Sequence, residues 1–202
     1  MTPTNLMDLS NWHLAEQTIS SKGQKTCQLT ADHKPVSFYL GSHLRTRFGA
    51  STYDRNVESC RKNLDFDITD DKQIRAMLQQ IDEWTIEYIF AHGGKIMKKV
   101  MVKDIIKENY KSLLSMYGDR VSVKTKINTA GIRACQFWDE YRKSCDLPND
   151  WLSNTYDVKA SLPQLWIMGS SFGWTRETTD LLVRPIRLEC PFISCHDKCS
   201  KD

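Results

Sequence analysis

The chain has 202 residues, of which 40% are hydrophobic and 26% charged, a composition that excludes wholesale disorder and favours one globular domain. No run of about 18 apolar residues occurs, so we expect no membrane-spanning helix. The formal net charge of +3 is too small to identify a polyanionic partner unless the charge is unevenly distributed.

Residues 1–30 are polar and rich in Ser, Thr and Gln, and we expect them to precede a single domain at 31–187. The opening stretch, MTPTNLMDLSNWHLAEQ, has neither the basic start nor the continuous apolar run of a signal peptide. Seven cysteines without such a signal are more typical of thiols than of a disulfide framework, and the odd number agrees. We therefore expect an intracellular, reducing compartment.

Strand-like composition follows at 34–51, where Gly41 and Gly49 interrupt it. Glycine has no side chain to pack in a sheet, so we expect the strand material to break at these positions. A short apolar alternation comes next, at 64–68, between polar and acidic residues.

A first helix is predicted over about 72–92. Asp70 and Gln73 are spaced as in a capping box, and the glycines at 93–94 are typical of a helix end. Trp84 belongs to the apolar stripe of this helix, so we expect it to pack in the core. The stripe recurs three and four residues apart and comprises Ile74, Met77, Leu78, Ile81, Trp84, Tyr88 and Ile89.

A second helix is predicted over 102–117, with Gly118 as its stop. Lys103, Lys107 and Lys111 fall four residues apart on another face, which is most simply a solvated face. The buried stripe of this helix would comprise Val102, Ile105, Ile106, Leu113, Leu114 and Tyr117.

From residue 119 the apolar period changes from helical to two. Over 120–127 we predict a strand with a basic outer face, on which Arg120, Ser122, Lys124 and Lys126 alternate with Val121, Val123, Thr125 and Ile127. The sequence NTAG at 128–131 predicts a turn, and 132–139 predicts a returning strand. In that strand Arg133 and Phe137 would share one face.

The stretch LWIMGSSFGWTRETTDLLV, at 165–183, predicts two strands joined by a glycine-serine turn. Alternation assigns Leu165 and Ile167 to the core, which leaves Trp166 on an open face with Arg176 nearby. Trp174 shares the alternation of Arg176. In the alternative interpretation both tryptophans are core residues and Arg176 is a solvated neighbour.

Enzyme signatures are absent from the sequence. It contains no phosphate-binding glycine loop, no HExxH and no GxSxG, and its five histidines have no catalytic spacing. The cluster Cys190, Cys195, His196 and Cys199 suggests zinc, but its gaps differ from the CxxC spacing of structural sites. We therefore predict no enzymatic activity, no cofactor, and a cysteine-rich tail at 188–202.

Positive charge is concentrated in one segment. Residues 95–126 contain nine Lys or Arg and three acidic residues, an excess of +6, and Arg133 would extend this surface. Aromatic and cationic side chains together on an open sheet face are typical of proteins that bind single-stranded nucleic acid, because bases stack on the rings and cations neutralise phosphates.

The C-terminal half resembles the single-stranded DNA-binding proteins of large eukaryotic DNA viruses, which are similar to the replication proteins of short-tailed phages. YGDRVSVKTKINTAGIRACQFWD and LPQLWIMGSSFGWTRETTDLLV carry the resemblance, which spans roughly residues 36–185. The matching positions are Lys124, Lys126, Phe137 to Asp139, Trp166, Gly169, Phe172, Gly173 and Trp174. The ending CHDKCSKD departs from the acidic tail with which such proteins often recruit replication partners.

This resemblance implies an α+β protein with an OB-fold-like antiparallel β-barrel and an inserted helical segment. It implies non-catalytic, largely sequence-independent binding of single-stranded DNA in replication or repair, in a viral factory or the nucleus of a host cell, with replication proteins as further partners. The sequence does not separate DNA from RNA, and homo-oligomerisation stays open. The alternative is a small α+β protein-interaction module with structural tryptophans. The expected binding residues are Lys103, Lys107, Lys124, Lys126, Arg133, Phe137, Trp166, Trp174 and Arg176.

Overall fold

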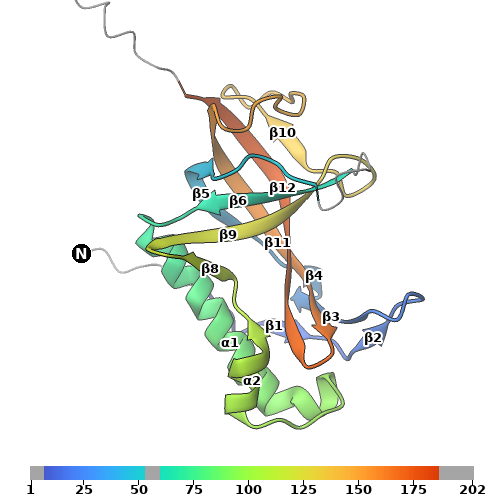
Figure 1. Ribbon diagram of the computed structural model, residues 1–202. Coiled ribbons are helices and arrows are strands. Elements are labelled where there is room, and N and C mark those ends of the chain that lie inside the picture. Colours follow the sequence, from blue (N-terminus) through green and yellow to red (C-terminus); the bar gives the residue numbers. More distant parts are fainter. Residues whose placement is uncertain (1–6, 53–59, 187–202) are drawn as a thin grey trace, which may run out of the picture.

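The computed structural model describes residues 7–52 and 60–186 and has an α+β architecture, as predicted (Figure 1). Two helices accompany one sheet of twelve strands in this part of the chain, and neither helix is long and apolar enough to cross a membrane. The elements are β1 (Trp12–Leu14), β2 (Thr18–Ile19), β3 (Lys25–Ala31), β4 (Lys34–Pro35), β5 (Ser37–Thr46), β6 (Arg61–Asp67), α1 (Lys72–Ile96), α2 (Lys103–Asn109), β7 (Tyr110–Lys111), β8 (Leu114–Tyr117), β9 (Arg120–Asn128), β10 (Gln136–Trp138), β11 (Asn154–Met168) and β12 (Ser171–Pro185).

Five of the strands pair in a closed circuit. β5 pairs with β6, β6 with β9, β9 with β12, β12 with β11, and β11 with β5. The β9–β12 pairing is parallel and the other four are antiparallel. The strand predicted over 120–127 is confirmed as β9, with Val121, Val123, Thr125 and Ile127 buried.

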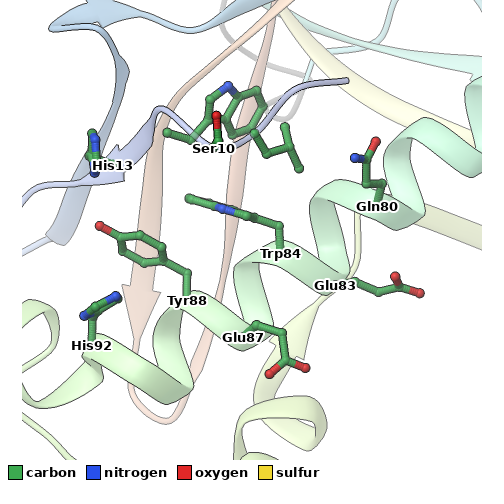
Figure 2. Close-up of a pocket in the computed structure, with 10 residues that line it drawn as sticks. Ser10, His13, Gln80, Glu83, Trp84, Glu87, Tyr88 and His92 are labelled. Carbon is green, nitrogen blue, oxygen red and sulfur yellow. The ribbon is translucent and has the colours of Figure 1, made fainter. Parts of the chain in front are cut away.

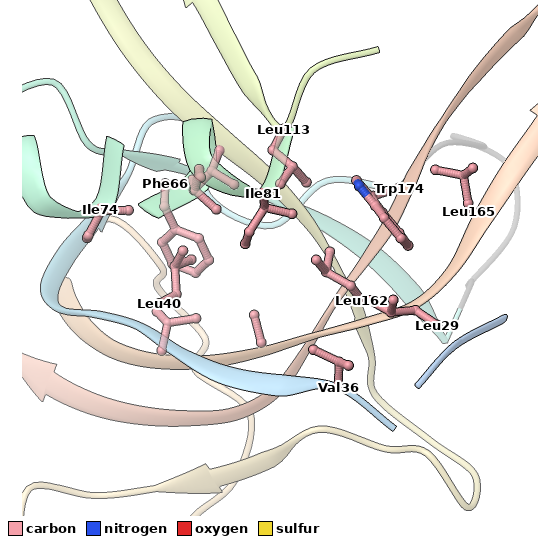
Figure 3. Packing of buried hydrophobic residues seen from close by; sticks show 14 of the residues in the cluster. Leu29, Val36, Leu40, Phe66, Ile74, Ile81, Leu113, Leu162, Leu165 and Trp174 are labelled. Atoms are coloured by element: carbon pink, nitrogen blue, oxygen red, sulfur yellow. The ribbon is translucent and has the colours of Figure 1, made fainter. Parts of the chain in front are cut away.

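The β11–β12 hairpin departs from simple alternation. Its register shifts between Ser161 and Gln164, where β11 contains one residue more than the facing part of β12. As a result Leu162 and Leu165 both point into the core, although they are three residues apart (Figure 3). Beyond the irregularity β11 pairs with β3 through Gln164–Ile167, so the end of the hairpin is part of a wider sheet.

Helix α1 begins at Lys72, as predicted, but it ends later than predicted, at Ile96. Its N-cap is Asp71, whose carboxylate accepts a hydrogen bond from Ile74 N, and not Asp70. The helix continues through the two glycines to Ile96, because Gly93 is buried and the Ile96 carbonyl accepts a hydrogen bond from Gln17 N. Tertiary contacts therefore outweigh the tendency of glycine to end a helix.

Gly41 lies within β5 and does not break it. A Cβ atom at this position would collide with Ile74 Cδ1 on α1. The glycine therefore lets the first turn of the helix approach the strand closely, which is the packing role that an interior strand glycine can have.

The helix predicted over 102–117 is only the seven-residue α2, followed by the short strands β7 and β8. Asp82 on α1 provides the reason for the break. Its carboxylate accepts hydrogen bonds from Tyr110 Oη (2.6 Å), Ser112 Oγ and Leu113 N (3.1 Å). These bonds hold the chain in an extended conformation, after which β8 pairs with β9.

Two further segments differ from the sequence prediction. Residues 7–30, expected to lie outside the domain, form β1, β2 and most of β3 and contribute Leu9, Trp12 and Leu14 to the core. Of the strand predicted at 132–139 only β10 forms, and it pairs with β12 in parallel instead of returning along β9. The cysteine-rich tail lies outside the described residues.

Candidate nucleic-acid interface

A basic hollow of about 550 Å³ lies where the end of the β11–β12 hairpin meets β3, β6 and β9. We call it the Trp166 hollow. Its four cations come from three separate segments of the sequence. They are Lys22, Lys25, Arg61 and Lys126, and they surround Trp166 together with Gln164, Met168 and Thr175.

Trp166 is half-buried and lies on the open side of the hairpin, as predicted. Its partners on the neighbouring strands are Thr26 and Gly173, both small. A Cβ atom on Gly173 would lie 2.9 Å from Trp166 Cζ2 and 3.1 Å from Lys111 Cβ, so the indole lies directly against this glycine. The strand beneath supports the ring, and part of the ring remains accessible.

Lys126 brings an unbalanced positive charge into the hollow. Its pKa is lowered, first by partial burial and then by the neighbouring charges of Arg61 and Arg176, while Glu177 opposes the shift. Glu177 also forms an ion pair with Arg61 at 2.9 Å. An anion bound beside Lys126 would relieve this repulsion, as a phosphate group does in nucleic-acid sites.

The outer face of β9 extends the basic surface. Lys124 and Arg120 are exposed on the same side as Lys126, and the register pairs Lys124 with Asp65 and Lys126 with Asn63 of β6. The predicted basic face is therefore present, except at Ser122, which is buried.

Trp174 does not lie on this face. It is 2% exposed, it pairs with Leu165, and its Nε1 donates a hydrogen bond of 3.0 Å to Thr85 Oγ1 on α1 (Figure 3). The prediction that it lines an open groove is wrong, because its alternation places it opposite Trp166.

Arg176 is likewise turned inward. Its guanidinium donates to the carbonyl of Leu113 at 3.0 Å, and burial lowers its pKa although Tyr110 and Asp82 act in the other direction. The side chain therefore stabilises the junction of β12 with the segment after α2, and the prediction of a surface position is wrong.

The remaining predicted residues have different environments. Phe137 is 9% exposed and packs against Trp151 with ring centres 6.3 Å apart, so it has no free face for a base. Arg133 is exposed and lines a neighbouring hollow of about 570 Å³, which shares Gln164 with the Trp166 hollow. Arg133 therefore remains a candidate binding residue.

Lys103 and Lys107 belong to α2 and do not line the Trp166 hollow. Lys103 forms an ion pair with Glu87 on α1. Lys111, from the same sequence stripe, lies beside Gly173 in the β7–β12 pairing and so reaches the edge of the site. Sequence reasoning did not place Lys22, Lys25, Arg61 or Lys111 in the site, because only long-range strand pairing brings them together.

A second hollow, of about 670 Å³, lies between α1 and the segment before β1 (Figure 2). Trp84 lines it and is half-buried, so it does not lie fully in the core as predicted. Its ring centre is 4.8 Å from that of Tyr88, which is 4.6 Å from that of His92. Glu83 and Glu87 are exposed along the same helix, so this hollow is aromatic and acidic.

Metal ligands do not cluster in the part of the chain that the structure describes: no group of three or more His, Cys, Asp or Glu is placed to hold an ion there. The four cysteines in this part are free thiols, and burial raises the pKa of Cys27 to about 11. The predicted cluster around Cys190 lies outside the described residues.

Comparison with known proteins gives structural neighbours only, since no protein-family model and no curated protein matches the chain. A solved structure of the single-stranded DNA-binding protein from bacteriophage Enc34 in complex with ssDNA is 10% identical with a TM-score of 0.45, covering 89% of this chain and 95% of that one. The gp2.5 single-stranded DNA-binding protein encoded by bacteriophage T7 is 13% identical with a TM-score of 0.49, covering 82% and 98%.

Proposed function

We propose that this protein binds single-stranded DNA without catalysis, along the outer face of β6 and β9 and in the Trp166 hollow. One observation carries the proposal: Trp166 lies partly exposed among Lys22, Lys25, Arg61 and Lys126. An accessible indole offers a base a stacking surface worth about 1–3 kcal/mol, and the cations around it offer contacts to the phosphates.

The strand pairing supports an OB-type barrel for the closed circuit of β5, β6, β9, β11 and β12. In chain order β6 and β9 are the second and third strands of this circuit, and the turn after Met168 joins the fourth and fifth. OB folds bind oligonucleotides on the second and third strands and on the adjoining loops. The contribution of Arg61 on β6 and Lys126 on β9 to the Trp166 hollow supports this assignment.

The chemistry of the site favours binding that tolerates any sequence. Stacking requires only the flat face of a base, and cations recognise the phosphate, which is common to all nucleotides. Duplex DNA conceals its base faces, so single strands should be preferred. We therefore propose a role in viral DNA replication or repair, where exposed single strands must be covered, with the replication proteins of the same system as partners.

The direct test is fluorescence anisotropy with labelled (dT)12, the matching duplex and (rU)12. We expect tighter binding of (dT)12 than of duplex, and weaker binding by Trp166→Ala and Lys126→Ala. The control is Lys143→Ala, which removes an exposed lysine that does not line the hollow. Equal affinity for duplex and single strand would contradict the proposal, and tighter binding of (rU)12 would change the ligand to RNA.

The aromatic and acidic hollow beside α1 favours a second candidate function, a protein-interaction module. Rings such as Trp84 and Tyr88 flanked by Glu83 suit a cationic side chain of a partner. Calorimetric titration with hexa-arginine should then detect binding that the combined Glu83→Gln and Trp84→Ala changes abolish. Undiminished binding by that variant would exclude this hollow as the site.

A further inference from the structure

Two exposed aromatic side chains and one arginine form a cluster on the sheet, away from the Trp166 hollow. It consists of Arg47, Phe48 and Tyr117, which we call the Arg47 cluster. The Arg47 Cζ atom is 5.0 Å from the ring centre of Phe48 and 5.2 Å from that of Tyr117. Phe48 is 71% exposed and Tyr117 is 75% exposed. Rings exposed to this extent contribute little to the core, and the face of each ring that Arg47 does not cover is open to solvent.

Backbone pairing locates this cluster over β6 and β9. Arg47 directly follows β5, and its N–H donates to the carbonyl of Asp65 on β6 at 2.9 Å. Tyr117 is the last residue of β8 and pairs with Arg120 at the start of β9. The contact from Arg47 to Tyr117 therefore crosses the outer face of both strands. Ser122 alternates onto that face of β9, yet it is only 1% exposed, as expected beneath such a crossing.

Positive charge lies close to the cluster, beside several carboxylates. Burial alone would raise the pKa of Asp67, but hydrogen bonds from Thr69 and the charges of Arg120 and Arg47 lower it overall. The Asp67 carboxylate is thus stabilised as an anion by two arginines. Lys124, exposed further along β9, connects this region with Lys126 at the other end.

We propose that the Arg47 cluster is a second base-stacking site, and that one DNA strand runs along β9 from the Trp166 hollow to Phe48 and Tyr117. The inference rests on the proposed function. Lys126 and Arg120 are six positions apart, or about 20 Å at 3.3 Å per residue. One OB fold covers about 4–16 nucleotides, so a single strand bound to it is long enough to reach both sites.

The test measures the affinity of single-residue variants for labelled (dT)12. Phe48→Ala and Tyr117→Ala should each weaken binding by about 5- to 150-fold, the effect of losing one base–aromatic stack. Because neither side chain is charged, the slope of log affinity against log salt should not change, whereas Arg120→Ala should reduce it by about 0.7. Melting temperatures should stay at the wild-type value, and Phe48→Trp should retain the affinity.

Phe90→Ala is the matched control, because Phe90 is an exposed phenylalanine on α1. If Trp166→Ala weakens binding while Phe48→Ala and Tyr117→Ala bind like wild type, the second site is wrong and the proposed function stands. A lowered melting temperature with unchanged affinity would make the Arg47 cluster a structural contact and overturn the inference. Failure of the wild-type protein to bind (dT)12 would overturn both.

Discussion

Trp166 and Trp174 lie on adjacent strands of one hairpin, but their environments are opposite. Trp166 pairs with Gly173 and faces the basic hollow, whereas Trp174 pairs with Leu165 and faces α1. Neighbouring residues of a strand point to opposite faces, so a difference of one position in register decides which ring is accessible.

Replacing each tryptophan by alanine should separate the two roles. Trp166→Ala is expected to weaken (dT)12 binding by about 1–3 kcal/mol with little change in melting temperature. Trp174→Ala should lower the free energy of unfolding by about 3–5 kcal/mol. The change leaves a cavity and removes the indole N–H that donates a hydrogen bond to Thr85 Oγ1. Anisotropy and urea denaturation measure the two quantities. A large loss of stability in Trp166→Ala with unchanged affinity would place Trp166 in the core as well.

Because of Lys126, the affinity for DNA should decrease at alkaline pH. Its pKa is lowered in the free protein by burial, Arg61 and Arg176, so Lys126 loses its charge below the ordinary value of 10.5. A bound phosphate favours the protonated amine and raises the pKa again, which couples binding to proton uptake. Affinity should therefore fall as pH rises through the lowered pKa towards 10.5.

Anisotropy with (dA)12 is the suitable measurement, because adenine does not lose a proton in this range. Lys126→Arg should retain its affinity to higher pH, since a guanidinium remains charged. If the affinity of the wild-type protein and that of Lys126→Arg fall equally at alkaline pH, another group causes the effect.

At the scale of elements, Asp82 connects α1 to the segment after α2. It receives hydrogen bonds from Tyr110, Ser112 and Leu113, and the Arg176 charge is nearby. Burial raises the pKa of the Asp82 carboxyl despite these interactions, so the group is largely removed from water. The same contacts keep β7 against β12, which borders the Trp166 hollow.

Asp82→Ala should lower the free energy of unfolding by roughly 3 kcal/mol or more, because it leaves the Tyr110 hydroxyl and the Arg176 guanidinium buried with fewer partners. Urea denaturation measures this change. Asp104→Ala, which removes an exposed carboxylate of α2, is the control and should have little effect. A similar small change in both variants would mean that the junction depends on apolar packing alone.

At the scale of the molecule, the net charge of +3 conceals two surfaces of opposite character. The outer face of β9 and the Trp166 hollow are basic, while the hollow beside α1 carries Glu83 and Glu87. This separation orients a polyanion towards the sheet and away from the helix.

The affinity for (dT)12 should decrease linearly with log salt, by about 0.7 per phosphate contacted. Removing Lys25 or Arg61 should each reduce the slope by about that amount, whereas removing Lys34, an exposed lysine that does not line the hollow, should not. Titrations at several salt concentrations provide the slopes. A slope of zero in the wild-type protein would show that phosphates are not neutralised.

Much of the fold could be predicted from local pattern. The strand at 120–127, the hairpin at 165–183 and the body of α1 all have apolar periods sustained over many residues, and all three are present. The second helix was predicted too long. Apolar spacing over 102–117 fits a helix, but Asp82, distant in sequence, holds part of that stretch extended.

The candidate site was only partly predictable. Lys124, Lys126 and Trp166 were identified because they follow a basic strand alternation and an open hairpin face. Arg61 and Lys25 were not, since neither stands in a basic strand alternation or beside an aromatic residue. Trp174, Arg176 and Phe137 were misplaced because alternation shows which residues share a face but not which face is covered.

The sequence by itself therefore determined the α+β class, the basic face of β9 and the presence of an aromatic hairpin, since each follows from residues close together in the chain. Only the tertiary structure decided which tryptophan is accessible, where the Arg47 cluster lies, and that residues 7–30 belong to the sheet. Those outcomes depend on strand register, on the irregularity after Ser161 and on the position of α1. Each of these depends on packing between distant segments, which no local pattern encodes.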